Sequence, residues 1–374
     1  MSALYLHIPF CRSKCHYCSF TSSAGCSDLF VPYVAALKKE LSSIATDNLS
    51  PLQSIFFGGG TPTILASDLL TEILDSCHTL FPMAPAIEIS VEANPGTVTE
   101  GSLRALAHAG VNRLSLGVQS LDDGDLKNLG RIHSADEAYA AVTAARSAGF
   151  ANLNLDLMCG LPDQTVSSWQ QTLDRALALQ PEHLSVYQLT VESETPFAEL
   201  LRSGRLSLPA EEDVIEMDRR TVQSCRDAGL IQYEISNYAR PEFECRHNVN
   251  YWENGEYLAA GVSAVSCLDG VREKRTNDIR DYIGKMTAGL PVVVERECLS
   301  ADASLRETVI MGLRMVRGVC RDSLRSRYGR DVAEYYGPIL EKLCNLGLVE
   351  LTATHLRLTE RGRPLANQIM AELV

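Results

Sequence analysis

The feature that most limits the fold of this 374-residue chain is a series of six short, apolar, β-prone segments separated by helix-like segments. Stretches between them, such as 28–45 and 67–81, carry apolar residues at helical spacings of three and four. Alternating strands and helices predict βα units and a parallel sheet, which curls into a barrel or part of one. Having six strands rather than eight predicts an α/β fold with an incomplete, open-sided (βα)6 barrel. The predicted strands are 3–8, 52–57, 86–93, 112–119, 152–158 and 183–189.

The alternation stops after about residue 195, and the C-terminal part has a different character. Residues 304–318 and 333–347 predict helices, and 348–362 predicts two short strands around a turn, followed by a final helix. This order is typical of a winged-helix-like domain. The predicted domains are a barrel core (1–240), a connecting region (241–299) and the winged-helix-like domain (300–374).

The charge and the first residues limit the partners and the compartment. A formal net charge of −13 disfavours a nucleic-acid partner, because phosphate neutralisation needs a basic face. The segment "MSALYLHIPF" has no export signal, and no apolar run approaches the roughly 20 residues of a membrane span. We therefore expect a cytoplasmic protein whose twelve cysteines do not form a disulfide framework.

A short loop after the first predicted strand, "HIPFCRSKCHYCSF", contains Cys11, Cys15 and Cys18. Their spacing puts all three sulfurs within reach of one iron–sulfur cube and leaves one iron without a protein ligand. An open metal position is where chemistry takes place. The alternatives are a zinc site completed by His7 or His16, or cysteines that only fill space.

Further motifs follow the next strands: "GGGTP" (58–62), "EANP" (92–95) and "VQS" (118–120). Because the C-terminal ends of barrel strands share one face, these motifs are predicted to meet at one active-site mouth. The glycines let backbone approach a ligand or fit a crowded corner, but the segment lacks the lysine of a phosphate-binding loop. Glu92, Gln119, Arg131 and Asp156 lie at or just after strand ends, where each alone could be a loop hydrogen bond or a solvated charge.

The C-x3-C-x2-C spacing, with Tyr17 before the last cysteine, resembles the signature of radical S-adenosylmethionine (SAM) proteins. In that superfamily the open iron of a 4Fe-4S cluster binds the amino and carboxylate groups of SAM, and the reduced cluster cleaves SAM to a 5′-deoxyadenosyl radical. The motifs "LYLHIPFC", "GVQS", "LGRIH" and "NLDLMCGLP" are similar, in order and spacing, to those of the anaerobic coproporphyrinogen III oxidase family along nearly the whole chain. This likeness implies a TIM-like radical SAM barrel.

The resemblance also implies which residues hold the cofactors. Cys11, Cys15 and Cys18 would be the cluster ligands. Arg131 would pair with the SAM carboxylate, and Glu92 and Asp156 would accept hydrogen bonds from the ribose hydroxyls or the amino group. The SAM site implied in this way consists of Tyr5, Tyr17, Gly59, Gly60, Thr61, Glu92, Gln119, Arg131 and Asp156.

Two absences separate the branches of this family. Oxygen-independent coproporphyrinogen dehydrogenases have a longer N-terminal arm and an additional cysteine two residues after the third, where this chain has Phe20. The chain instead resembles the heme chaperone branch, whose HN-x-x-YW motif appears as His247, Asn248, Tyr251 and Trp252. That likeness implies heme as a ligand and His247 as an iron ligand. The alternative is a structural turn in which His247 bonds backbone and the two rings close the open side of the barrel.

One departure bears on heme binding. Relatives read "GAHS" after this motif, whereas this chain has Val265 where the histidine is expected. Heme binding would then be weaker or would use His247 or Cys267. The implied function is binding of heme and its transfer to an unidentified acceptor protein. The rivals are a radical SAM enzyme acting on a porphyrin, such as a dehydrogenase, oxidase or methyltransferase, and a tRNA-modifying enzyme, which the acidic charge disfavours.

Overall fold

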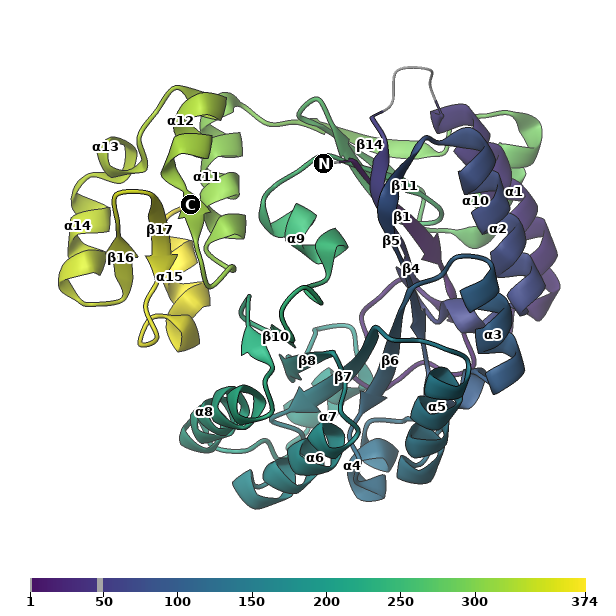
Figure 1. Cartoon of the computed structure of the whole chain (residues 1–374), viewed down its shortest axis with the longest axis horizontal. Coiled ribbons are helices and arrows are strands. Elements are labelled where there is room, and N and C mark those ends of the chain that lie inside the picture. Colours follow the sequence, from purple (N-terminus) through teal and green to yellow (C-terminus); the bar gives the residue numbers. More distant parts are fainter. Residues whose placement is uncertain (1, 46–49) are drawn as a thin grey trace.

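The computed structural model describes residues 2–45 and 50–374 and is built around a 12-stranded sheet (Figure 1). Six neighbouring strands at its centre run parallel in chain order. Each overlaps one of the six predicted segments, so the predicted βα architecture is confirmed. These strands are β1 (Ser2–Ile8), β4 (Leu52–Gly59), β5 (Met83–Ala93), β6 (Arg113–Gln119), β7 (Leu153–Cys159) and β8 (His183–Gln188).

The two faces of this sheet have opposite chemistry. Successive side chains of a strand point to opposite faces, and in β7 the residues Leu153, Leu155 and Leu157 belong to the main hydrophobic core. The residue between the last two, Asp156, and the preceding Asn154 face the other way and hydrogen-bond one another at 2.8 Å. The curved sheet therefore packs its apolar face against the helices and encloses a polar interior.

Helices cover the outer face of the sheet (Figure 1). Thr99, Ser134 and Thr165 begin three of them with reciprocal capping boxes, which satisfy the free backbone N–H groups of the first turn. The shorter α4 (Asp123–Asn128) and α7 (Pro196–Arg202) follow β6 and β8. The covering helices are α1 (Phe30–Ile44), α2 (Ser67–Leu80), α3 (Glu100–His108), α5 (Ala135–Ser147), α6 (Val166–Ala178) and α8 (Glu211–Asp227).

Additional strands extend both edges of the sheet. β10 (Asn237–Ala239) pairs antiparallel with β8, and β9 (Ile231–Gln232) with β10. At the other edge, β11 (Tyr257–Ala260) runs parallel to β1 and is followed by antiparallel β12 (Val265–Leu268), β13 (Val271–Arg275) and β14 (Val293–Cys298). The helix α10 (Ile279–Ala288) packs beside α1 at this edge. Residues 241–299 therefore contribute four strands to the same sheet as the barrel core.

A short helix, α9 (Arg246–Trp252), lies on the concave side of the sheet (Figure 1). The Glu88 carboxylate on β5 accepts hydrogen bonds from the backbone N–H groups of Arg246 at 3.0 Å and His247 at 3.2 Å. Since Glu88 is buried, this pairing fixes the start of α9 inside the barrel.

The C-terminal region forms a second hydrophobic core of its own. It consists of α11 (Ala301–Gly312), α12 (Arg321–Tyr328), α13 (Val332–Tyr336), α14 (Pro338–Asn345), α15 (Ala366–Glu372) and an antiparallel sheet of β15 (Val319–Cys320), β17 (His355–Leu358) and β16 (Val349–Leu351). The predicted helix 333–347 is broken into α13 and α14 because Gly337, at φ 47°, leaves the helical conformation before Pro338. The two predicted strands are β16 and β17.

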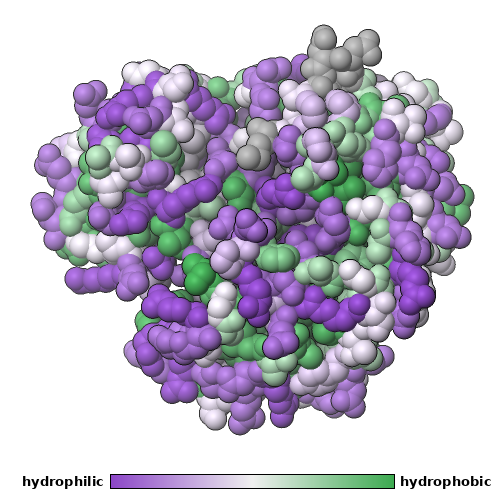
Figure 2. Space-filling model, viewed as in Figure 1, coloured by the Kyte–Doolittle hydropathy of each residue, from purple (hydrophilic) through white to green (hydrophobic). Residues whose placement is uncertain are grey.

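The two parts of the chain meet near the end of α9. The Arg314 guanidinium lies 4.4 Å from the centre of the Trp252 ring, and Glu234 forms an isolated β-bridge with Met315. The face shown in Figure 2 is mostly hydrophilic, with apolar side chains in small separate patches. Among the described residues, no helix has the length and apolar character needed to cross a membrane.

Candidate functional site

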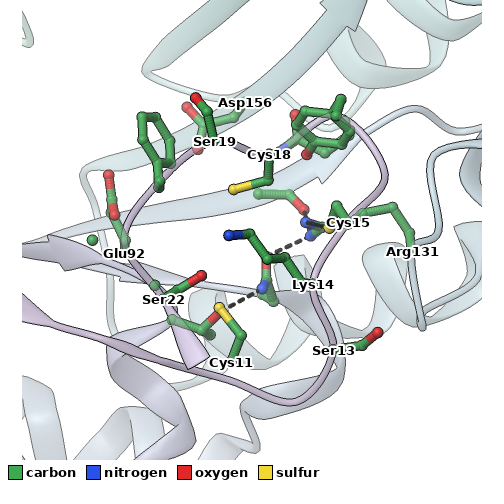
Figure 3. Close-up of a pocket in the computed structure, with 18 of the residues that line it drawn as sticks. Cys11, Ser13, Lys14, Cys15, Cys18, Ser19, Ser22, Glu92, Arg131 and Asp156 are labelled. Carbon is green, nitrogen blue, oxygen red and sulfur yellow. Dashed lines mark hydrogen bonds between the residues drawn. The ribbon is translucent and has the colours of Figure 1, made fainter. Parts of the chain in front are cut away.

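A cavity of about 420 Å³ opens at the C-terminal ends of the parallel strands, and all three cysteines of the predicted cluster motif line it (Figure 3). Cys11 ends the two-residue strand β2 (Phe10–Cys11), while Cys15 and Cys18 lie in the loop between β2 and β3 (Ser23–Ala24). All three thiols are partly exposed. Among the described residues, no three histidine, cysteine or carboxylate side chains converge tightly enough for a single metal ion.

Hydrogen bonds to other parts of the barrel hold the cysteine loop at its middle and at its far end. His16 anchors its middle to the end of α4, through its backbone N–H to Leu129 O at 3.0 Å and its ring Nδ1 to Asn128 O at 2.9 Å. His7 anchors its far end, because its ring Nε2 donates to Thr21 O at 2.9 Å. The loop is therefore anchored through His7 and His16, whose contacts do not involve the sulfurs.

The glycine segment after β4 lies directly against the first strand. A Cβ on Gly59, whose φ is 108°, would come within 2.5 Å of the His7 ring, and a Cβ on Gly60 within 2.6 Å of Phe10 O. The backbone N–H of Thr61 donates to Phe10 O at 2.7 Å, which places its hydroxyl 3.6 Å from the Cys11 sulfur. Only glycine fits these two positions, and the close approach brings the segment to the edge of the cysteine cavity.

Polar side chains from β5, β6 and β7 line the opposite part of the cavity. Burial and the neighbouring Asp156 carboxylate raise the pKa of Glu92 to about 8. Asp156 accepts hydrogen bonds from Ser115 at 3.1 Å and from Asn154 at 2.8 Å, and its burial raises its own pKa. Gln119 has a φ of 68° where β6 ends, so its side chain turns out of the strand alternation and into the cavity.

Arg131 connects the cysteine loop with this polar wall. Its guanidinium donates to Cys15 Sγ at 3.5 Å, to Gly117 O at 2.5 Å and to the Asn94 side-chain oxygen. Asn94 in turn donates to Thr61 Oγ1 at 2.8 Å. The cavity therefore combines three thiols, two cationic side chains and three carboxylates, the third being Glu192. This donor set fits an iron–sulfur cluster and a cofactor carrying an amino acid group.

The structure brings together eight of the nine residues predicted for SAM, together with the three cysteines. Those eight are Tyr17, Gly59, Gly60, Thr61, Glu92, Gln119, Arg131 and Asp156. Tyr5 is not among the residues that line the cavity: its hydroxyl lies 3.1 Å from His7 Nδ1, and its ring stacks on Phe56. Residues that the sequence reasoning missed include Lys14, Phe20, Met158 and Tyr187. All four could have been found from their positions in the sequence, because they lie either in the cysteine loop or near the end of β7 or β8.

His247 occupies a different environment inside the barrel, away from this cavity. Its Nδ1 pairs with Ser54 Oγ at 2.9 Å and its Nε2 with the Tyr251 hydroxyl at 3.1 Å. The ring stacks on Phe56 with centroids 5.0 Å apart, and burial together with the Arg113 charge lowers the pKa of His247 to about 3. Both nitrogens of the neutral ring therefore have hydrogen-bond partners within the protein.

The other positions discussed for heme lie on the added edge strands. Val265 begins β12, and Cys267 on the same strand is paired in register with Tyr257 of β11. Neither residue lines the cysteine cavity.

Comparison with known proteins places this arrangement in a family. Residues 5–176 match the radical SAM superfamily, and 299–365 match the HemN C-terminal domain. The chain is 36% identical to the heme chaperone HemW of Bacillus subtilis over 99% of its own length and 98% of the relative's. It is 36% identical to that of Escherichia coli, covering 98% of this chain and 97% of the relative.

The fold is similar to that of the solved coproporphyrinogen III oxidase HemN from E. coli, with a TM-score of 0.86. That similarity covers 100% of this chain and 89% of the other at 24% identity, so it bears on the fold alone. The identity to the curated relatives extends over essentially the full length of both chains. The protein therefore belongs to the HemW family of radical SAM proteins.

Proposed function

We propose that the protein is a cytoplasmic heme chaperone, which binds heme and passes it to an acceptor protein. The observation that carries this proposal is the full-length similarity to relatives named heme chaperone HemW, which includes both the barrel and the C-terminal domain. The acidic charge of the chain agrees with a protein or small-molecule partner rather than a nucleic acid.

We further propose that Cys11, Cys15 and Cys18 hold a 4Fe-4S cluster and that the polar wall of the cavity holds SAM. Three thiols facing a cavity whose other wall carries Arg131 support this, because a guanidinium pairs well with a carboxylate. When bound, the cluster and SAM can supply a one-electron cleavage that yields a carbon radical. The residues implied for SAM are Tyr5, Tyr17, Gly59, Gly60, Thr61, Glu92, Gln119, Arg131 and Asp156.

The heme ligand is a separate part of the proposal. His247 can bind iron only if it gives up its hydrogen bond to Ser54 or to Tyr251, because both ring nitrogens are paired. If His247 is the iron ligand, heme binding therefore breaks one of these two hydrogen bonds.

A second candidate is a radical SAM enzyme acting on a porphyrin. The observation that favours it is the completeness of the cavity, where the cysteines and eight predicted SAM residues converge. A chaperone that only binds heme has no need of such a set. Turnover of SAM coupled to a modified porphyrin would establish this alternative.

The deciding experiment is an anaerobic titration of the cluster-reconstituted protein with heme, followed by Soret absorption, with metal-free porphyrin as the control ligand. Saturable binding that requires the iron is expected for a chaperone. Transfer is then measured by mixing the heme-loaded protein with an apo-acceptor and following the spectrum of the acceptor. Absence of heme binding, or equal binding of the metal-free ring, would contradict the proposal.

A further inference from the structure

Two large rings at the cavity mouth remain unexplained by the cluster and SAM residues. Phe20 is 69% exposed and Tyr187 is 40% exposed, yet both line the same cavity. A single exposed apolar side chain needs no explanation. Two rings that border one cavity from different elements are a stronger signal, because both are available to the same ligand.

Tyr187 belongs to the outermost layer of the barrel interior. On β8 the side chains of His183, Ser185 and Tyr187 alternate onto the inner face, with Tyr187 nearest the C-terminal end. Its register partner on β7 is Met158, which also lines the cavity. A ring and a thioether side by side form one apolar wall.

Phe20 provides a second apolar surface from the cysteine loop, two residues after Cys18. Among the described residues, none of the hydrophobic clusters includes Phe20. Its ring therefore contributes little to the core. The same loop supplies Lys14, whose side chain points into the cavity (Figure 3). The cavity mouth thus offers two apolar surfaces and the Lys14 cation, with the Glu192 carboxylate as a further charged group of the lining.

We propose that Phe20 on one side, and Tyr187 with Met158 on the other, hold the porphyrin ring of heme at the mouth of the barrel. A porphyrin is a flat apolar disc with two carboxylates at one edge, and Lys14 can pair with a carboxylate. His247 offers no comparable surface, since it is buried and both of its nitrogens are bonded. The inference rests on the proposed function, because it names where the heme of that function binds.

The test measures heme and SAM affinity in parallel on the cluster-reconstituted, full-length protein. Phe20→Ala and Tyr187→Ala are each expected to weaken heme binding by about tenfold, as for loss of a stacking ring. Tyr187→Phe keeps the ring and should bind heme like the wild type. Leu290→Ala, at an apolar residue that is 57% exposed but does not line the cavity, is the matched control. The affinity for SAM should stay at the wild-type value in Phe20→Ala.

Two results would overturn the inference while leaving the proposed function intact. One is heme affinity unchanged in both alanine variants, provided that the wild type binds heme. The other is a loss of SAM affinity as large as the loss of heme affinity, which would place the rings against the adenine of SAM. Failure of the wild type to bind heme would overturn the proposed function itself, and the inference with it.

The carboxylate contact has its own test. Heme dimethyl ester lacks the charged carboxylates, so Lys14→Gln should weaken the binding of heme about fivefold and leave the ester unchanged. Iron and sulfide content, measured on the same samples, shows whether the cluster is intact. An equal loss for heme and its ester would overturn the role of Lys14.

Discussion

The mouth of the barrel and the interior around His247 are both lined with polar side chains, but their hydrogen bonding differs. At the mouth, three thiols and the Glu92 carboxylate face a cavity of about 420 Å³. Around His247, each ring nitrogen has a partner and the ring is stacked on Phe56. Groups left open to a cavity can bind a ligand without rearrangement, whereas satisfied groups must first break a bond. The difference indicates that the mouth is built for binding and the interior for holding α9.

The largest expected effect concerns the cysteines at the mouth of the barrel. Cys15→Ala removes one of the three thiols of the cavity, so we expect loss of the cluster and of its visible absorption after anaerobic reconstitution. Cys26→Ala is the matched control, because Cys26 is also a partly exposed free cysteine but does not line the cavity. Retention of a full cluster in Cys11→Ala, Cys15→Ala and Cys18→Ala would refute the assignment.

The second prediction concerns the interior around His247, where both ring nitrogens are hydrogen-bonded. His247→Phe keeps a ring against Phe56 but leaves the Ser54 and Tyr251 hydroxyls without their partner. We expect the free energy of unfolding to fall by about 2 kcal/mol, as measured by chemical denaturation. The exposed His108 on α3 gives the control His108→Phe, which should change stability little. If His247→Phe kept its stability and lost only heme binding, the interior around His247 would also be a ligand site.

A smaller effect is expected for Arg131, whose guanidinium is fixed at the mouth of the barrel. Arg131→Lys replaces a planar fork by a single ammonium, so SAM binding should weaken by about tenfold while cluster content stays unchanged. Equilibrium dialysis with labelled SAM measures the affinity. Arg104→Lys is the control, because Arg104 pairs with Glu100 on the exposed side of α3. If Arg131→Lys bound SAM like the wild type, the proposed carboxylate contact would be wrong.

The smallest effect is the pH dependence caused by Glu92 in the protein without SAM. Its folded-state pKa of about 8 lies above the ordinary value of 4.5, so the folded protein holds this proton more tightly than the unfolded chain. Its contribution to stability is therefore complete below about pH 4.5 and is lost as the pH rises through about 8.

Glu92→Gln cannot lose a proton, so its free energy of unfolding should fall less than that of the wild type between pH 4.5 and pH 8.5. Denaturation curves at the two pH values test this. An identical pH dependence in both proteins would mean that Glu92 is ionised in the folded state at neutral pH.

The sequence predicted the mouth better than the interior for a physical reason. The mouth is assembled from strand ends, and strand ends were visible as apolar runs followed by short polar motifs. The rule that parallel strands end on one face then brought Glu92, Gln119 and Asp156 together without knowledge of distances. Thr61 followed because it lies two residues after β4, whereas the role of Arg131, which lies beyond α4, was implied only by the family resemblance.

The environment of His247 has no comparable local signal. Ser54 lies 193 residues earlier in the chain, and α9 meets it where its start is bonded to Glu88 of β5. The placement of Tyr5 behind the cavity depends on the His7 ring and on Phe56, which no spacing rule identifies. Likewise, the break between α13 and α14 follows from the positive φ of Gly337, although the apolar pattern continues across it.

The close contact between Gly59 and the His7 ring has a consequence for protein engineering. The cysteine loop is held at its far end by His7, and His7 is accommodated only because position 59 has no side chain. A loop of residues 8–23 transplanted alone into another barrel would lack this support. A functional graft must therefore carry the first strand and the glycine segment together, and a sequence library that varies position 7 must vary position 59 with it.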